Sequence, residues 1–265
     1  MPVSAHGTAY DLAGPEEAPV VTLVHGIGVK RQLWDGFVAR LSRHYRVLSY
    51  DLLGHGESIR ADETLSLRLF ASQLETLLDE LGIGQTTIIG FSMGGMINRR
   101  FAIDFPSRAR ALVIMNSPHR RDAAAQRLVE ERAGKTDAGG PAATIGESMA
   151  RWFTPEFLGG NHPEIATIRE WILANHPPSY AQSRQVLATG VLELVDPSPP
   201  LDLPVLVITC EHDSGSTPQM ARAIAAEIDG ATCHIVPRLQ HLGMLENPQA
   251  FLLPIEEFLG GLYGN

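Results

Sequence analysis

The stretch IIGFSMGGM, residues 88–96, sets one serine among glycines at the end of an apolar run. Gly90, Ser92 and Gly94 fit the pattern G-x-S-x-G, in which a serine stands on a sharp turn between a strand and a helix. The small residues let strand and helix approach, so that the serine Oγ projects into the open. A strand pattern, TTIIGF, precedes the turn and a helix pattern, MINRRFAIDF, follows it. Ser92 is therefore a candidate nucleophile; a glycine-rich connection with an incidental serine is the structural alternative.

Short β-branched runs recur on both sides of this turn, with helical patterns between them. Buried strands are predicted at residues 20–26, 46–51, 86–91, 111–116, 204–210 and 232–237. Apolar residues at helical spacing mark residues 32–45 and 65–82, and the second helix closes on Gly82. Alternating strands and helices indicate an α/β fold with a mostly parallel twisted sheet and helices on both faces. The segment AHGTAYDL, residues 5–12, is predicted as an antiparallel edge strand.

The alternation stops after Pro118. Residues 119–200 carry no clear strand pattern but several helical stretches, such as RDAAAQRLVEERAG and HPEIATIREWILANH, separated by Gly- and Pro-rich joints. We therefore predict a core formed by residues 1–118 and 201–265 and a helical cap, residues 119–200, laid over the sheet.

Composition narrows the functional classes. The chain has 265 residues, enough to bury a large core, and its 30 acidic against 21 basic residues give a net charge of −9, which argues against a nucleic-acid binder. No apolar run approaches the roughly 18 residues of a membrane span, and the start lacks a secretory signal pattern. Cys210 and Cys233, the only cysteines, fall at opposite ends of predicted neighbouring strands, too far apart for a disulfide. These features predict a reduced, cytoplasmic protein.

A serine hydroxyl needs a base beside it and a group that orients the base. In this architecture the acid and then the histidine follow the serine along the chain. Asp213 comes just after the strand pattern VLVITC, at the edge where open α/β sheets build sites, and His241 follows the last strand. Glu211 is the competing acid, but Asp213 lies further out on its loop, where a carboxylate can reach the next loop. The predicted catalytic residues are Ser92, Asp213 and His241.

An acyl-transfer site also needs N–H donors for the oxyanion that develops on the substrate. The predicted donors are the backbone N–H of Met93, directly after the nucleophile, and that of Ile27 in the loop HGIG. The two glycines of HGIG keep that backbone approachable. His25 is interpreted as a residue that braces this loop.

Five motifs occur together: HGIG (25–28), YDLLGHGES (50–58), GFSMGG (90–95), CEHDSGSTP (210–218) and HLGMLENP (241–248). In order and spacing they resemble the α/β-hydrolase superfamily. Within it, HLGMLENP and the stretch ARWFTPEF (150–157) are similar to the 3-oxoadipate enol-lactonase and carboxylesterase branch.

The resemblance implies an α/β-hydrolase fold with a helical cap inserted after the sixth strand. It also implies that Ser92, Asp213 and His241 form a triad that needs no cofactor. The turn YDLLGHGES would brace the oxyanion loop, which gives His55 a structural role. Cys210, where relatives usually have glycine, and His212 depart from the family pattern, and neither change removes a catalytic group.

Several basic residues in and beside the cap are candidate contacts for a charged substrate: Arg99, Arg100, His119, Arg120, Arg121 and Arg151. For any one of them, a solvated helix charge is the simpler interpretation. Arg151 and the adjacent Trp152 are predicted as substrate-binding residues, on family likeness and on their aromatic surroundings; packing of the cap is the alternative for Trp152.

Other classes fit less well. GIGVKR lacks the third glycine of a dinucleotide-binding loop, and G-x-x-x-x-G-K-[ST], H-E-x-x-H and paired cysteines do not occur, so no metal site is predicted. The sequence therefore predicts a cofactor-independent serine hydrolase that cleaves a small carboxylic ester or lactone, with enol-lactone hydrolysis in aromatic catabolism as the form suggested by the resemblance. Carbon–carbon bond hydrolases, amidases and perhydrolases share the triad, and a non-enzymatic ligand-binding member is the alternative from another class. The predicted partner is a small molecule rather than nucleic acid or membrane; a homodimer is left open.

Overall fold

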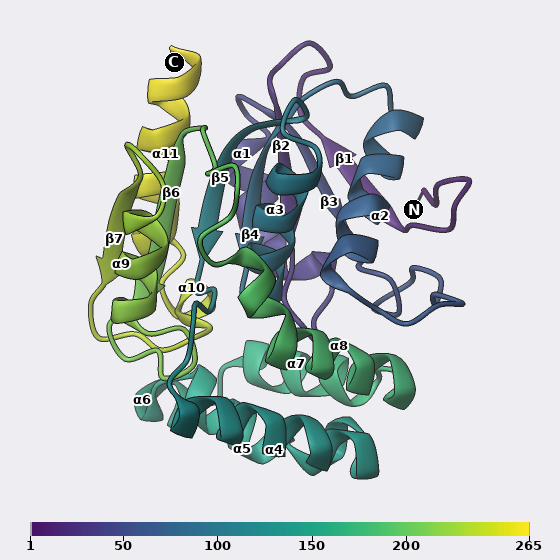
Figure 1. Cartoon of the computed structure of the whole chain (residues 1–265), viewed down its shortest axis with the longest axis vertical. Coiled ribbons are helices and arrows are strands. Elements are labelled where there is room, and N and C mark those ends of the chain that lie inside the picture. Colours follow the sequence, from purple (N-terminus) through teal and green to yellow (C-terminus); the bar gives the residue numbers. More distant parts are fainter. Residues whose placement is uncertain (1, 265) are drawn as a thin grey trace.

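A seven-stranded sheet runs through the computed structural model, which describes residues 2–264 (Figure 1). Its strands are Tyr10–Ala13 (β1), Val20–Val24 (β2), Arg46–Tyr50 (β3), Thr86–Phe91 (β4), Ala109–Met115 (β5), Val205–Cys210 (β6) and Thr232–Val236 (β7). Across the sheet the order is β1-β3-β2-β4-β5-β6-β7; β1 is antiparallel to β3 and the other neighbours are parallel. The predicted mostly parallel sheet with an antiparallel edge strand is confirmed.

Helices cover both faces of the sheet, which is why the central strands can be apolar without interruption. The helices outside the β5–β6 connection are Arg31–Trp34 (η1), Asp35–Leu41 (α1), Leu67–Glu80 (α2), Met93–Asp104 (α3), Pro218–Ala226 (α9), Gly243–Glu246 (α10) and Gln249–Tyr263 (α11). In Figure 1, α2, α3 and α9 lie in front of the sheet, and α1 and α11 lie behind it. Every residue of β4 and of β6 is buried.

Local sequence sets the bounds of α2. Ser66 begins the helix with its Oγ accepting from the backbone N–H of Leu69 at 3.1 Å. The apolar stripe of α2, which includes Phe70 and Leu74, is fully buried. The chain leaves the helix at Gly82, whose φ of 64° suits glycine, as the sequence predicts.

Between β5 and β6, where every residue is described, the chain forms helices and no strand. They are Ala123–Gly139 (α4), Pro141–Ala143 (η2), Ile145–Trp152 (α5), Pro155–Gly159 (α6), Pro163–Leu173 (α7), Pro177–Thr189 (α8) and Gly190–Leu194 (η3). Figure 1 shows α4–α8 gathered below the sheet, at the end toward which the parallel strands run. We call this segment the helical segment.

The helical segment follows the fifth strand, so its predicted position after a sixth strand was wrong. The strands predicted from the residue patterns number five before Pro118, and the structure has these five, with one of them, β1, before β2; the sixth followed only from the resemblance. Within residues 2–9 the strand-like pairing is limited to an isolated bridge between Val3 and Ala9, and the edge strand predicted at residues 5–12 lies at Tyr10–Ala13.

The two cysteines are free, Cys210 buried and Cys233 exposed. The parallel register sets Cys210 beside Val236 and Cys233 beside Val207. No helix within residues 2–264 has both the length and the apolarity required to cross a bilayer.

Two histidines, His25 and His55, are buried together, with ring centroids 5.4 Å apart. Burial and the neighbouring His25 lower the pKa of His55 to about 3, and burial also lowers the pKa of His25. Both rings are therefore neutral in the folded protein at neutral pH.

We expect these histidines to make the protein sensitive to mild acid. Below pH 6.5 the two histidines take up protons in the unfolded chain but stay neutral in the folded chain. The free energy of unfolding therefore falls as the pH is lowered from 6.5 toward 3. Through His55 alone, the free energy of unfolding should fall by about 1.5 kcal/mol between pH 6.5 and pH 5. Urea unfolding at several pH values in this range measures the slope of the free energy of unfolding against pH. The slope should flatten in His55→Gln and stay unchanged in His212→Gln, a change at a side chain that is 56% exposed; equal slopes in wild type and His55→Gln would refute this assignment.

Candidate active site

Ser92 occupies the turn between β4 and α3 in a backbone conformation that few residues adopt. Its φ is 56° and its ψ is −113°, and its backbone N–H donates to the carbonyl of Met115 at 2.8 Å. A Cβ on Gly90 would overlap the carbonyl of Gly94, and a Cβ on Gly94 would overlap the carbonyl of Val24. The flanking glycines are therefore required by the close approach of backbone to backbone around the serine.

His241 lies against this serine, in the connection between β7 and α10. Its Nε2 is 3.1 Å from Ser92 Oγ, and its Nδ1 is 2.7 Å from Asp213 Oδ2. A carboxylate can only accept, so in the neutral ring Nδ1–H donates to Asp213, which leaves Nε2 to accept from the serine hydroxyl. The structure thus brings together the three side chains that the sequence singled out.

The Asp213 side chain is buried, with 2% of the residue exposed, and both of its carboxylate oxygens accept hydrogen bonds. Its Oδ1 accepts from the backbone N–H groups of Gly215 and Ser216, both at 2.9 Å. Burial opposes the ionisation of this carboxyl, but the contact with His241 and the donated hydrogen bonds outweigh it and lower the pKa of Asp213. Glu211, the competing acid, lies elsewhere: it accepts from the backbone N–H of Arg238 and its side chain is half exposed.

Asn116 is a site residue that the sequence analysis missed. It follows β5, has a φ of 46°, and donates from Nδ2 to Asp213 Oδ2 at 2.9 Å, the oxygen that also accepts from His241. The available signal was a polar residue ending the apolar run ALVIMN at the same sheet edge as Ser92. The run ALVIMN does not indicate that the Asn116 amide donates to a carboxylate in the loop after the neighbouring strand.

The loop after β2 lies beside the serine, as predicted for an oxyanion loop. A Cβ on Gly26 would sit 3.1 Å from Ser92 Cβ, and Gly28 has a φ of 78°. Ile27 lines the same cavity as Ser92 and His241. Met93, whose N–H is the other predicted donor, is the first residue of α3 and is buried.

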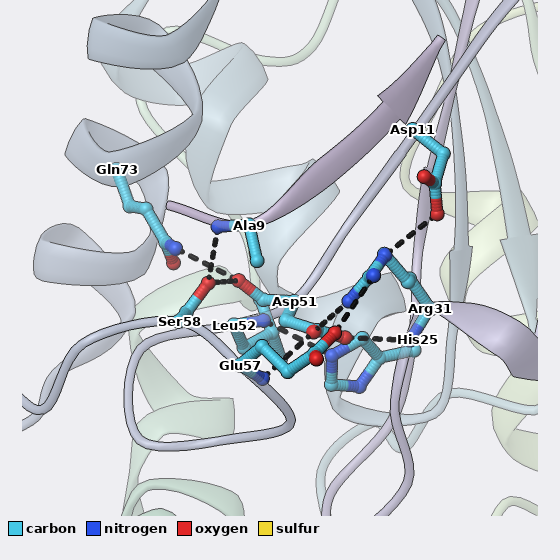
Figure 2. Close-up of polar contacts among 9 residues, drawn as sticks. All are labelled: Ala9, Asp11, His25, Arg31, Asp51, Leu52, Glu57, Ser58 and Gln73. Atoms are coloured by element: carbon cyan, nitrogen blue, oxygen red, sulfur yellow. Dashed lines mark hydrogen bonds and ion pairs between the residues drawn. The ribbon is translucent and has the colours of Figure 1, made fainter. Parts of the chain in front are cut away.

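A buried polar network fixes this loop against the turn that follows β3 (Figure 2). His25 Nδ1–H donates to the carbonyl of Gly26 at 2.7 Å, and its Nε2 accepts from the backbone N–H of Leu52 at 3.0 Å. Asp51, wholly buried, pairs with the Arg31 guanidinium and accepts from the Arg31 backbone N–H at 2.8 Å. His25 therefore braces the loop, in agreement with its interpretation from the sequence.

A cavity of about 240 Å³ opens above Ser92 between the sheet edge and the helical segment. Arg151 and Trp152, the two predicted substrate-binding residues, both line it, and the rings of Trp152 and His241 are 6.3 Å apart. The backbone N–H of Leu242 donates to the carbonyl of Trp152 at 2.8 Å, which ties α5 to the histidine loop.

Among the other basic candidates, only Arg121 lines this cavity. The remaining four serve local contacts: Arg99 donates to the carbonyl of Pro118, Arg100 pairs with Asp104, His119 contacts Glu227 and Arg120 pairs with Asp196. Two cavity arginines, Arg132 and Arg184, were missed by the sequence analysis, because in a helical pattern they look like ordinary surface charges. Within residues 2–264, no group of three or more His, Cys, Asp or Glu side chains is placed to hold a metal ion.

Known proteins share this architecture over nearly their whole length. A model of the alpha/beta hydrolase family matches residues 23–252. The (E)-2-((N-methylformamido)methylene)succinate hydrolase of Acinetobacter baylyi is 26% identical over 251 residues, covering 94% of this chain and 93% of that protein. The 3-oxoadipate enol-lactonase 2 of the same organism is 28% identical over 263 residues, covering 94% of each.

Among solved structures, the enol-lactonase from Burkholderia xenovorans LB400 superimposes with a TM-score of 0.85 at 27% identity, covering 95% of this chain and 96% of that one. The resemblance inferred from the five sequence motifs is confirmed by these matches. Because the family model spans β3–β7, the helical segment and the histidine loop, the chain belongs to the alpha/beta hydrolase family.

Proposed function

We propose that the chain is a cofactor-independent serine hydrolase that cleaves a small carboxylic ester or lactone through an acyl-enzyme. One observation carries the proposal: Ser92 Oγ, His241 and Asp213 form a continuous hydrogen-bonded series, 3.1 Å and 2.7 Å, and its Ser92 and His241 end lines a cavity. A hydroxyl that borders the cavity and is joined to an oriented imidazole is what activation of a serine nucleophile requires.

In the proposed reaction, His241 Nε2 takes the proton of Ser92 as Oγ attacks the substrate carbonyl. Asp213 holds the imidazole in the required tautomer and stabilises the imidazolium. The N–H groups of Ile27 and Met93 bind the oxyanion, and each lowers the barrier by about 3 kcal/mol. His241 protonates the departing alkoxide, which for a lactone stays attached to the acyl group, and then activates the water that releases the acid.

The helical segment has a definite place in this proposal. We assign residues 119–200 as a cap on a core of residues 1–118 and 201–265, because Arg151 and Trp152 reach the cavity from it. We assign these two side chains as substrate contacts: the guanidinium suits a carboxylate or carbonyl oxygen, and the indole suits an apolar substrate face.

The relatives support ester or lactone cleavage. One is a 3-oxoadipate enol-lactonase, and a relative from Aeromonas hydrophila is a pimeloyl-[acyl-carrier protein] methyl ester esterase. Enol-lactone hydrolysis in aromatic catabolism is thus the most specific form of the proposal. A carbon–carbon bond hydrolase is the second candidate, since the same three side chains can serve that reaction.

A panel of matched substrates tests the proposal: p-nitrophenyl esters, enol-lactones, anilides and vinylogous diketones. We expect turnover of esters or lactones at least about 100-fold above that of anilides, because the amine is the poorer leaving group. Turnover confined to the diketones would favour the second candidate. Turnover of none of them, together with no reaction of Ser92 with a phosphonate, would favour a non-enzymatic ligand-binding protein.

Asn116 should act as a positioning residue for Asp213. Asn116→Gly keeps the positive φ without strain but removes the amide that donates to Asp213 Oδ2. Because a hydrogen bond to a charged group contributes about 1.5–3 kcal/mol, kcat should fall about 10- to 100-fold while KM stays within about twofold. Steady-state kinetics on the best panel substrate measures both; a change confined to KM, or no change, would show that Asn116 only fills space.

A further inference from the structure

The cavity above Ser92 is lined by arginines. Four of them face it, Arg121 from the segment just before α4, Arg132 from α4, Arg151 from α5 and Arg184 from α8, and no aspartate or glutamate belongs to its lining in the part of the chain that the structure describes. This is unusual for a chain with a net charge of −9. The positive charges are concentrated where a substrate would bind.

Three of these guanidinium groups are incompletely paired. The Nε atoms of Arg121, Arg151 and Arg184 are buried with no hydrogen-bond partner within residues 2–264. Arg121 donates to the carbonyls of Leu187 and Ala188 and to the amide oxygen of Gln126, and Arg184 donates to the hydroxyl of Thr144 at 3.3 Å; these acceptors are all uncharged. Burying an N–H donor of a cation without an acceptor is costly, because the group gives up its hydration.

The mutual repulsion of these groups adds to that cost. Burial, and then the charges of Arg132 and Arg184, lower the pKa of Arg151 to about 10. Burial likewise lowers the pKa of Arg121 to about 10. Both groups stay protonated at neutral pH, so the cavity retains its positive charge in the empty protein.

The charged side chains in and beside the cavity that are named here carry an excess of two positive charges. The cations are Arg121, Arg132, Lys135, Arg151 and Arg184; Glu130 acts on Arg121, and Glu147 and Asp213 act on Arg151. Glu147 also pairs with Lys135 at 3.0 Å and with Arg132 at 3.7 Å. Asp213 accepts a hydrogen bond from His241. Five positive against three negative charges would be balanced by a ligand that carries two negative charges.

We propose that this cavity binds a substrate with two carboxylate groups, so that the scissile ester or lactone belongs to a small polycarboxylic acid. This deepens, and rests on, the proposed ester or lactone hydrolysis. Arg151 and Arg184 bind one carboxylate, and Arg121 and Arg132 bind the other. The apolar side chains of Leu128, Val129 and Leu187 contact the carbon chain between them. A cavity of about 240 Å³ limits this molecule to a small one.

Equilibrium binding to the wild-type protein tests the ligand class without any chemistry. Titration calorimetry at constant ionic strength would compare glutarate and adipate, which carry two charges, with butyrate, which carries one, and with neutral succinamide. We expect the dianions to bind at least about 10-fold more tightly than butyrate, because they form a second set of charge-assisted hydrogen bonds. Equal affinities for butyrate and the dianions would overturn the proposal, and tighter binding of inorganic phosphate than of any dicarboxylate would replace the carboxylate class by a phosphate.

Variants assign the affinity to individual residues. Arg184→Met and Arg121→Met each remove one guanidinium and keep an unbranched apolar side chain, and each should weaken dicarboxylate binding about 10- to 100-fold. Arg127→Met is the matched control, since Arg127 is an exposed residue of α4 outside the cavity lining, and it should leave the affinity unchanged. Thermal unfolding identifies any variant that fails to fold, and the other variant then carries the test. Two folded variants with wild-type affinity would refute the assignment.

The outcomes separate this proposal from the one on which it rests. Hydrolysis of neutral p-nitrophenyl acetate with no preference for dianions would refute the dicarboxylate substrate and leave the serine hydrolase intact. Tight binding of dicarboxylates with no hydrolysis of any ester or lactone would refute the hydrolase and leave the ligand class standing.

Discussion

Ser92→Ala should abolish turnover while leaving the fold intact. Loss of the nucleophile from a Ser–His–Asp site lowers kcat by a factor on the order of 10⁶, because Ser92 is the hydroxyl that His241 Nε2 contacts and activates. The backbone at Ser92 already has a positive φ with a Cβ present, so alanine adds no new strain there. Single-turnover and steady-state assays on the best panel substrate measure the loss, and the unfolding midpoint checks the fold.

A buried serine on the same sheet edge provides the matched control for this variant. Ser117 accepts from Arg99 Nη2 at 3.1 Å and does not belong to the cavity lining. Ser117→Ala should keep at least about half of the activity. If Ser92→Ala retained more than a tenth of wild-type turnover, Ser92 could not be the nucleophile.

Asp213→Asn should lower kcat by a factor on the order of 10⁴. The asparagine amide would donate to His241 Nδ1 where the carboxylate now accepts, and the ring would then carry its proton on Nε2, facing Ser92. A ring in that tautomer cannot take the serine proton. Fold and substrate binding should survive, since asparagine is isosteric and its carbonyl can still accept the N–H groups of Gly215 and Ser216.

Glu211→Gln is the matched control for the acid. It lies two residues away, and its half-exposed side chain accepts from the backbone of Arg238. This variant should stay within about twofold of wild-type kcat. If it proved more damaging than Asp213→Asn, the wrong carboxylate would have been assigned.

Much of the core and of the candidate site could be predicted because their determinants are local in sequence. The turn around Ser92 needs small residues at fixed offsets, and parallel strands of buried residues are recognisable as unbroken apolar runs. Asp213 and His241 could be predicted because strand order in such a sheet dictates which loops meet at its edge.

What could not be predicted depends on how distant segments pack. Asn116, which follows β5, contacts Asp213 in the loop after the neighbouring strand β6, and nothing within the run ALVIMN specifies that contact. Arg132 and Arg184 reach one cavity only because α4 packs against α8 in the helical segment. The position of the cap after a sixth strand was wrong for a different reason: it followed from the family resemblance, whereas the strand patterns of this chain number five before Pro118, as in the structure.

Covalent labelling with a fluorophosphonate is the most direct test of Ser92 as an activated nucleophile. Mass spectrometry of the intact folded protein should show one added phosphonyl group per chain, and fragmentation should place it on Ser92. The same reagent should leave His241→Ala and urea-unfolded protein unmodified, because activation requires the folded contact between Ser92 Oγ and His241 Nε2. Ester turnover by a protein that takes up no phosphonate, or that takes it up at another residue, would contradict the assignment of Ser92.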